Sequence, residues 1–418
     1  MRRRLTIAVA LAAAAVLPAA CGGAAAGEPG EDRDRVARNV IFIMGDGMGV
    51  GAREFLRLAL AGPDGELAMD GLPVAGRVHT SAADPEWAVT DSAAAATALA
   101  TGVKTYNGAI GVGPDGQPVR TVLERAKAAG KSTGLVTTSQ VTDATPAAFA
   151  AHVAARSDQS AIAEQYLEPT GVDVILGGGE DHWFPEGDPG AHPDRPPADP
   201  EEASAGTRGD LVERAVGLGY EYVSDAKELQ AAGSGKLLGL FANEEMFEHR
   251  GDGEGGSYAP AVPLSDMTAK ALEALADDED GFFLVVEEEG IDEMAHHNNA
   301  QLLLEAGRAL DAAVEVALRF QAEHPDTLII LTGDHETGGL AIEDVNPQDE
   351  SGDAESREDG PFTIAGTATQ FVVDWSTWGH TGADIPVTAG GPGAGALDGV
   401  VDNTDVHTAM LDAMQLED

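Results

Sequence analysis

Short apolar runs that alternate with helical segments constrain the fold of this chain more than any other feature. The runs lie at residues 40–44, 133–138, 172–176, 282–286 and 327–331. Strands that are apolar throughout and separated by helices are typical of a parallel sheet covered on both faces. The sequence therefore predicts an α/β fold, a three-layer α/β/α sandwich with a mostly parallel central sheet. Acidic stretches rich in Pro and Gly predict long surface insertions near 180–260 and 343–362 of a single domain that spans 36–418.

Hard oxygen ligands and an imidazole follow several of these runs. Asp46 follows the first, Thr145 lies shortly after the second, and Glu287 comes directly after residues 282–286. Asp334 and His335 follow residues 327–331 after a short Gly-containing turn. Because ligands bind beyond the carboxyl ends of parallel strands, this repetition favours a metal-loaded cleft at one rim of the sheet. The neighbouring acids at 288 and 289 leave the choice at 287 ambiguous, and the position directly after the strand favours Glu287.

A second group of ligand types lies outside the strand ends. Asp292 and His296 are four residues apart, and a helix there would place both on one face, where they could share a zinc ion. A solvated helix face with a stray histidine is the alternative, and His297 is a competing ligand that this spacing disfavours. His380 lies in a turn bordered by Gly379 and Gly382.

A possible nucleophile stands at the start of an alanine-rich segment. Thr90 and Asp91 are good N-cap residues before the run at 93–96, so Ser92 should occupy the first turn of a helix. Free N–H groups and the helix dipole make such a position an anion site. Taken alone, this segment favours a plain capped surface helix, because Thr-Asp-Ser before alanines is common.

The net charge of −46 excludes some partners. It argues against binding to nucleic acid or to an anionic membrane surface. An anionic substrate would need local positive charge, which bound metal ions could supply.

The N-terminus predicts export. Basic residues 2–4 precede an apolar stretch at 5–20 and small residues around Cys21, so residues 1–21 are predicted to be an export signal and 22–35 a flexible tether. Residues 17–21 resemble a bacterial lipoprotein signal, which would make Cys21 the lipidated first residue and anchor the protein to a membrane. Pro18 departs from that pattern, and cleavage near Ala20 without a lipid is the alternative. The expected location is the periplasm, the cell surface as a lipoprotein, or the medium.

Taken together, these motifs resemble the alkaline phosphatase family. The matching segments run in family order and span nearly the whole chain after the tether: 40–49, 90–101, 137–156, 282–296, 331–339 and 378–382. The resemblance implies hydrolysis of phosphate monoesters through a phosphoserine at a centre of two Zn²⁺ and one Mg²⁺, and it is compatible with a homodimer.

The resemblance also implies a role for each matching residue. One zinc would be held by Asp292, His296 and His380, and the second by Asp46, Asp334 and His335. Magnesium would be held by Asp46, Thr145 and Glu287, with Asp143 supporting it through water. Ser92 would be the nucleophile, and Arg156 would grip the phosphate with two guanidinium hydrogen bonds.

One departure and three alternatives accompany this resemblance. Glu293 stands where familiar members carry Lys, His or Trp, so a carboxylate near the phosphate should repel product or recruit more magnesium. A sulfatase of the same superfamily would need a Cys-x-Pro-x-Arg-like segment, but alanines follow Ser92. Superfamily phosphodiesterases usually favour Thr as nucleophile. An inactive exported protein that binds metal or phosphate is the alternative from another class.

Overall fold

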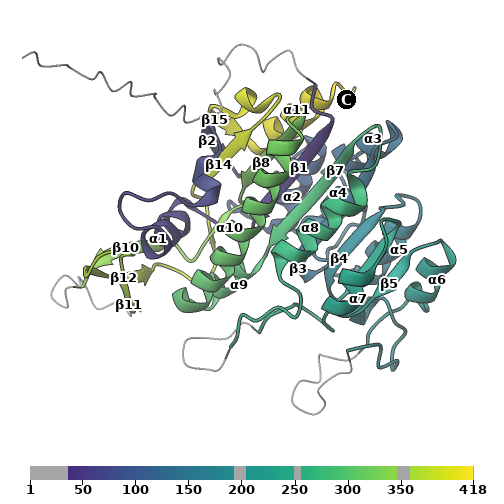
Figure 1. Ribbon diagram of the computed structural model, residues 1–418, viewed down its shortest axis with the longest axis horizontal. Helices are drawn as coiled ribbons and strands as arrows, with labels where there is room; N and C mark the ends of the chain where they lie inside the picture. The colour runs from purple at the N-terminus through teal and green to yellow at the C-terminus, as the bar shows by residue number, and fades with distance from the viewer. Residues whose placement is uncertain (1–35, 193–203, 249–255, 346–357, 418) are drawn as a thin grey trace, which may run out of the picture.

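The computed structural model describes residues 36–192, 204–248, 256–345 and 358–417, and a ten-stranded sheet runs through its middle (Figure 1). In spatial order the strands are β15 (Gly399–Asp402), β2 (Val74–His79), β14 (Ile385–Gly390), β8 (Thr327–Thr332), β1 (Asn39–Gly45), β7 (Phe282–Glu288), β3 (Ser132–Gln140), β4 (Val174–Gly178), β6 (Leu237–Leu240) and β5 (Glu221–Val223). β14 is antiparallel to β2 and β8, and the other pairings in this sheet are parallel. The prediction of a mostly parallel central sheet is confirmed.

Helices cover both faces of the sheet, as Figure 1 shows. One core contains apolar side chains from α2 (Ser92–Thr101), α3 (Val122–Ala128), α4 (Ala144–Ala150), α5 (Gln159–Leu167), α6 (Leu211–Gly217) and α11 (Asn403–Met414). The other core contains side chains from α1 (Val50–Leu60), α7 (Ala226–Ala231), α8 (Leu264–Leu275), α9 (Gly290–His296) and α10 (Ala300–Glu323). These two cores complete the predicted three-layer sandwich.

The central strands divide their side chains between the two cores. In β1, Val40 and Phe42 belong to one core, whereas Ile41 and Ile43 belong to the other. Successive side chains of a strand point to opposite faces, so a strand covered on both faces must be apolar at nearly every position. This requirement explains the continuous apolar runs in the sequence.

Smaller elements complete the described chain. A three-stranded sheet contains β10 (Leu340–Asp344), β12 (Gln370–Trp375) and β11 (Asp359–Thr363), and a two-stranded one contains β13 (His380–Thr381) and β9 (Glu336–Thr337). Short 3₁₀ helices are η2 (Ala68–Gly71), η3 (Glu180–His182) and η4 (Ala394–Leu397). The region near 180–260, predicted as an insertion, includes β5 and β6, so part of it forms one edge of the central sheet.

The N-terminal predictions lie outside the described residues. They concern the export signal at 1–21, lipidation of Cys21 and the tether at 22–35. Within the part of the chain that the structure describes, no helix combines the length and apolar character needed to cross a membrane.

The register of the parallel strands brings the predicted site residues to one rim. Met44 in β1 pairs with Glu287 in β7 and with Thr332 in β8, and Glu287 also pairs with Thr137 in β3. The neighbouring strands β8, β1, β7 and β3 therefore end at the same rim of the sheet, and the segments that follow them leave the sheet there. Asp46 lies in one of these segments.

Candidate metal centre beside Ser92

Ser92 lies at the N-terminus of α2, as predicted. The Asp91 side chain caps this helix by accepting a hydrogen bond from the Ala94 N–H at 2.9 Å. Its second carboxylate oxygen accepts from the Gly108 N–H at 2.8 Å, which ties the cap to the following loop. Ser92 is 4% exposed, and its Oγ lies 3.1 Å from Nε2 of His335. The hydroxyl is therefore held at the positive end of the helix and beside an imidazole.

The first ligand cluster contains Asp46, Asp334 and His335. Nε2 of His335 lies 3.2 Å from Oδ2 of Asp334 and 3.6 Å from Oδ1 of Asp46. The backbone N–H groups of Gly47 and His335 donate to Oδ1 of Asp334 at 3.1 and 2.9 Å. These two bonds fix the Asp334 carboxylate so that its other oxygen lies beside the imidazole. All three side chains are buried.

The second ligand cluster contains Asp292, His296 and His380. α9 carries the first two, and Nε2 of His296 lies 3.2 Å from Oδ2 of Asp292, as expected for residues on one helix face. Nε2 of His380 lies 3.0 Å from Nε2 of His296 and 3.8 Å from Oδ1 of Asp292. The predicted set of three ligands has therefore converged in space.

Backbone carbonyls orient the imidazoles of this second cluster. Nδ1 of His296 lies 2.5 Å from the Trp378 carbonyl oxygen, and Nδ1 of His380 lies 3.0 Å from that of Thr90. A carbonyl can only accept, so each Nδ1 carries a proton, and Nε2 is the atom that offers a lone pair once the ring is neutral. Metal-binding histidines are commonly held in this way.

Several carboxylate and hydroxyl oxygens of the site have no hydrogen-bond partner, and a metal ion could take that place. Four buried oxygen atoms of the predicted ligand residues have no hydrogen-bond partner: Asp46 Oδ1, Asp334 Oδ2, Glu287 Oε1 and Thr145 Oγ1. Burial raises the pKa of Asp46 well above its usual value, and the Asp334 and Asp292 charges raise it further. Burial also raises the pKa of Glu287 to about 8. A bound cation would stabilise the charged carboxylates, so the residues fit metal ions.

A third group of oxygens lies beside these clusters. Thr137 donates to Oε2 of Glu287 at 2.6 Å, which leaves the other oxygen of that carboxylate without a partner. Asp143 precedes α4, and Thr145 lies in the first turn of this helix. Hard oxygens from carboxylate and hydroxyl groups suit Mg²⁺.

Arg156 lies among acids that flank Ser92. Its Nη2 donates to both oxygens of Asp143 at 2.9 and 3.0 Å, and its Nη1 lies 3.8 Å from Oδ2 of Asp91. The charge of Asp143 is the main cause of the raised pKa of Arg156, so the guanidinium stays charged. The cation is therefore linked to the N-cap that positions Ser92.

Comparison with known proteins shows the family of this chain. The family model for alkaline phosphatase matches residues 37–368. The chain belongs to the alkaline phosphatase family. "Alkaline phosphatase 3" of Bacillus subtilis is 32% identical, with 90% of this chain and 89% of the relative covered. "Streptomycin-6-phosphate phosphatase" of Streptomyces griseus is 35% identical, with 91% of each covered.

A solved alkaline phosphatase has the same fold. The enzyme from the Antarctic bacterium TAB5 superposes with a TM-score of 0.72 at 28% identity, covering 92% of this chain and 99% of the other. A variant of that enzyme has Mg bound in a site called M3. This chain is an alkaline phosphatase, an enzyme that hydrolyses phosphate monoesters.

Several neighbours of this alkaline phosphatase's candidate site were not predicted from the sequence. Thr337 donates a short hydrogen bond to Asp292, and its Oγ1 lies 3.2 Å from Nδ1 of His335. The orienting carbonyls of Thr90 and Trp378 were also missed. All three residues lie within the segments that carry the family resemblance, but only the folded chain shows which atoms they touch.

Proposed function

We propose that this alkaline phosphatase transfers the phosphoryl group of a monoester to Ser92 and then hydrolyses the phosphoserine. The observation that carries the proposal is the position of Ser92 Oγ, 3.1 Å from Nε2 of His335, an imidazole near both ligand clusters. The helix N-terminus and the charged Arg156 would hold the phosphate for attack by this hydroxyl. Asp91 and Asp143 would keep the guanidinium in place.

We assign the ligand sets to two zinc ions and one magnesium ion. Asp292, His296 and His380 would hold one zinc; Asp46, Asp334 and His335 would hold the other; Asp46, Thr145 and Glu287 would hold magnesium, supported by Asp143. Mixed imidazole and carboxylate sets suit zinc, and an all-oxygen set suits magnesium. Such ions, when bound, supply Lewis acidity for the attacking and leaving oxygens of an in-line displacement.

A comparison of ester classes tests the proposed reaction. The protein, loaded with zinc and magnesium, should hydrolyse a chromogenic phosphate monoester much faster than the matching phosphodiester or sulfate ester. Faster hydrolysis of the diester or the sulfate would favour another activity of the superfamily. Full metal content without hydrolysis of any ester would favour a protein that only binds metal or phosphate.

Zinc binding at the second cluster is expected to strengthen as the pH rises. Burial lowers the pKa of His296, but the hydrogen bond and charge of Asp292 outweigh it and raise the pKa to about 9. In the metal-free protein, protonated His296 stabilises the folded state, and this contribution is fully present below the ordinary pKa of a histidine. It is lost as the pH rises through about 9. Zinc must displace this proton, so affinity should rise about tenfold per pH unit below pH 9. Chelator competition measures the slope, and an affinity independent of pH would contradict the assignment.

Exchanging the charge at position 293 should change product binding. Glu293 is one residue beyond the proposed zinc ligand Asp292 on α9, and the family resemblance implies that this position faces the phosphate. A Glu293→Lys substitution removes a repulsion and adds an attraction, each on the order of 1 kcal/mol, so it should lower the inhibition constant for inorganic phosphate by about 30-fold. Unchanged phosphate inhibition would refute the prediction.

We also propose export and a single catalytic domain. Residues 1–21 would direct export, 22–35 would tether, and 36–418 would form the catalytic domain. The acylated or free state of Cys21 would decide between a lipoprotein and a released enzyme. Mass spectrometry of the mature N-terminus would distinguish them, and size-exclusion chromatography with light scattering would test the homodimer.

A further inference from the structure

Three carboxylates beside the candidate centre have no ligand role in it: Glu245, Glu289 and Glu293. Glu289 is 6% exposed, and its Oε2 is buried without a hydrogen-bond partner. A buried carboxylate without hydrogen bonds or a counter-charge is strongly destabilising. A bound cation would supply the partner that this atom lacks.

The backbone brings these acids together from two directions. Glu289 precedes α9, and its N–H donates to Oγ1 of Thr138 at 3.1 Å. Glu293 lies one helical turn later, on the same face. The Met246 N–H donates to the Thr138 carbonyl at 3.0 Å. The backbone of the preceding residue, Glu245, therefore also lies close to Thr138.

The electrostatic surroundings of Glu289 are negative. The carboxylates of Asp143, Glu293, Glu245 and Glu287 are all close enough for their charges to act on Glu289. Arg156 donates two hydrogen bonds to Asp143 and is not among the main influences on Glu289. A further positive charge would thus relieve repulsion among several carboxylates at once.

A second oxygen without a partner lies in the same cluster. Gln140 donates its Nε2–H to Glu245 at 2.7 Å, while its Oε1 is buried without a hydrogen bond. An amide oxygen is a hard, neutral ligand of the kind that Mg²⁺ and Ca²⁺ accept.

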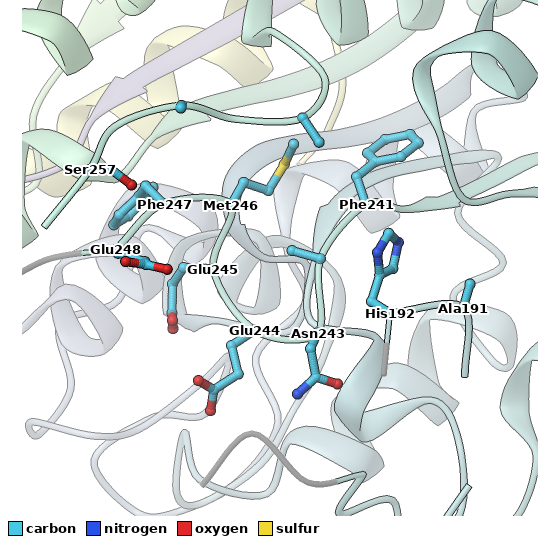
Figure 2. Close-up of a pocket in the computed structure, with 13 residues that line it drawn as sticks. Ala191, His192, Phe241, Asn243, Glu244, Glu245, Met246, Phe247, Glu248 and Ser257 are labelled. Atoms are coloured by element: carbon cyan, nitrogen blue, oxygen red, sulfur yellow. The ribbon is translucent and has the colours of Figure 1, made fainter. Parts of the chain in front are cut away.

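A pocket reaches one member of this cluster, Glu245. Glu245 lines a cavity of about 420 Å³ together with Glu244 and Glu248, and Figure 2 shows these three carboxylates along one wall. Negative potential in a pocket concentrates cations from solution. An entry path is one requirement of a credible metal site.

We propose that Glu289, Glu245 and Gln140 hold a further hydrated magnesium ion next to the three-ion centre. Among the described residues, neither Glu289 nor Glu245 belongs to a group of three closely spaced His, Cys, Asp or Glu ligand atoms. Water molecules would therefore complete the coordination of this ion. Mg²⁺ commonly binds through one or two carboxylates and several waters. The site lies outside the ligand sets proposed above, although it rests on the proposed function for its neighbouring ions.

Metal analysis of a single variant tests this site. Wild type and Glu289→Gln are dialysed to equilibrium with zinc and magnesium, and both metals are counted by mass spectrometry. Wild type should retain one more magnesium per chain than the variant, with equal zinc. Glu248→Gln is the matched control, because it removes a carboxylate of the same pocket that is not a main influence on Glu289. This control should retain the ion.

The outcomes separate this site from the proposed function. Equal magnesium in wild type and Glu289→Gln, with full zinc in both, would overturn the further site and leave the three-ion centre intact. If wild type lacked zinc but bound a magnesium ion that depended on Glu289, the three-ion centre would be overturned and the further site would stand. Should Glu289→Gln lose zinc or unfold early, Glu245→Gln replaces it and must show the same loss of one magnesium.

Discussion

Replacing Ser92 with alanine is expected to lower kcat/KM for a phosphate monoester by about 10³-fold or more. The hydroxyl is the proposed site of phosphoryl transfer, and it lies at a helix N-terminus, 3.1 Å from His335 Nε2. Alanine fits the buried position without strain, because the next turn of α2 is itself alanine-rich. Steady-state kinetics with a chromogenic phosphate monoester measure the loss.

The control for this variant separates chemistry from folding. Ser92→Ala should keep the zinc content of wild type, because Ser92 belongs to neither ligand cluster. Ser81→Ala removes an exposed hydroxyl that accepts a hydrogen bond from Lys104, and it should retain activity within about twofold. A Ser92→Ala enzyme with more than about a tenth of wild-type activity would exclude Ser92 as the nucleophile.

A His335→Ala substitution is expected to affect both metal content and activity. His335 is fully buried, and it lies within reach of both ligand clusters and of Ser92. Its loss would remove a proposed ligand of the proposed second zinc, and less positive charge would then balance the Asp46 and Asp334 carboxylates. We expect loss of bound zinc, a fall in kcat/KM of about 10³-fold or more, and a lower melting temperature.

Metal analysis, kinetics and calorimetry on the same samples check these three effects. His79→Ala is the matched control, because this exposed imidazole bonds Asp384 and is not one of the proposed metal ligands. It should retain zinc and most of the activity. Full zinc content and near-normal kinetics in His335→Ala would rule out the proposed zinc assignment.

The sequence predicted the architecture because its strongest signal is local. Apolar runs such as residues 40–44 must be buried on both faces, and their alternation with helices leaves few topologies. The positions of Asp46 and Asp334 then followed, because parallel strands end at a common rim. Spacing alone also placed Asp292 and His296 on one helix face, where the structure has them 3.2 Å apart.

The remaining features depend on contacts between distant segments. The pairing of Arg156 with Asp143, and the carbonyl that orients His296, arise only when separate loops meet. The sheet edge formed by β5 and β6 was not predicted, because residues 211–241 have mixed composition and weak periodicity. A short apolar run of this kind can become an edge strand only when a neighbouring strand is available to pair with it.

The environments of the three glutamates after residue 286 also could not be predicted from the sequence. The sequence favoured Glu287 as the ligand on the assumption that the strand ends before it, but β7 continues through Glu288. Glu288 accepts hydrogen bonds from Thr138 and Tyr258. Glu289 instead keeps an oxygen without a partner. Three identical side chains thus have different environments, which only the strand register and the neighbouring loops determine.

Trapping the phosphorylated enzyme tests the proposed mechanism most directly. The zinc- and magnesium-loaded protein would be incubated with a phosphate monoester, quenched in acid and digested for mass spectrometry. We expect a single phosphoryl group on the peptide that contains Ser92, absent from Ser92→Ala. An enzyme that turns over the monoester yet shows no phosphoserine, or carries the phosphoryl group on another residue, would contradict the mechanism.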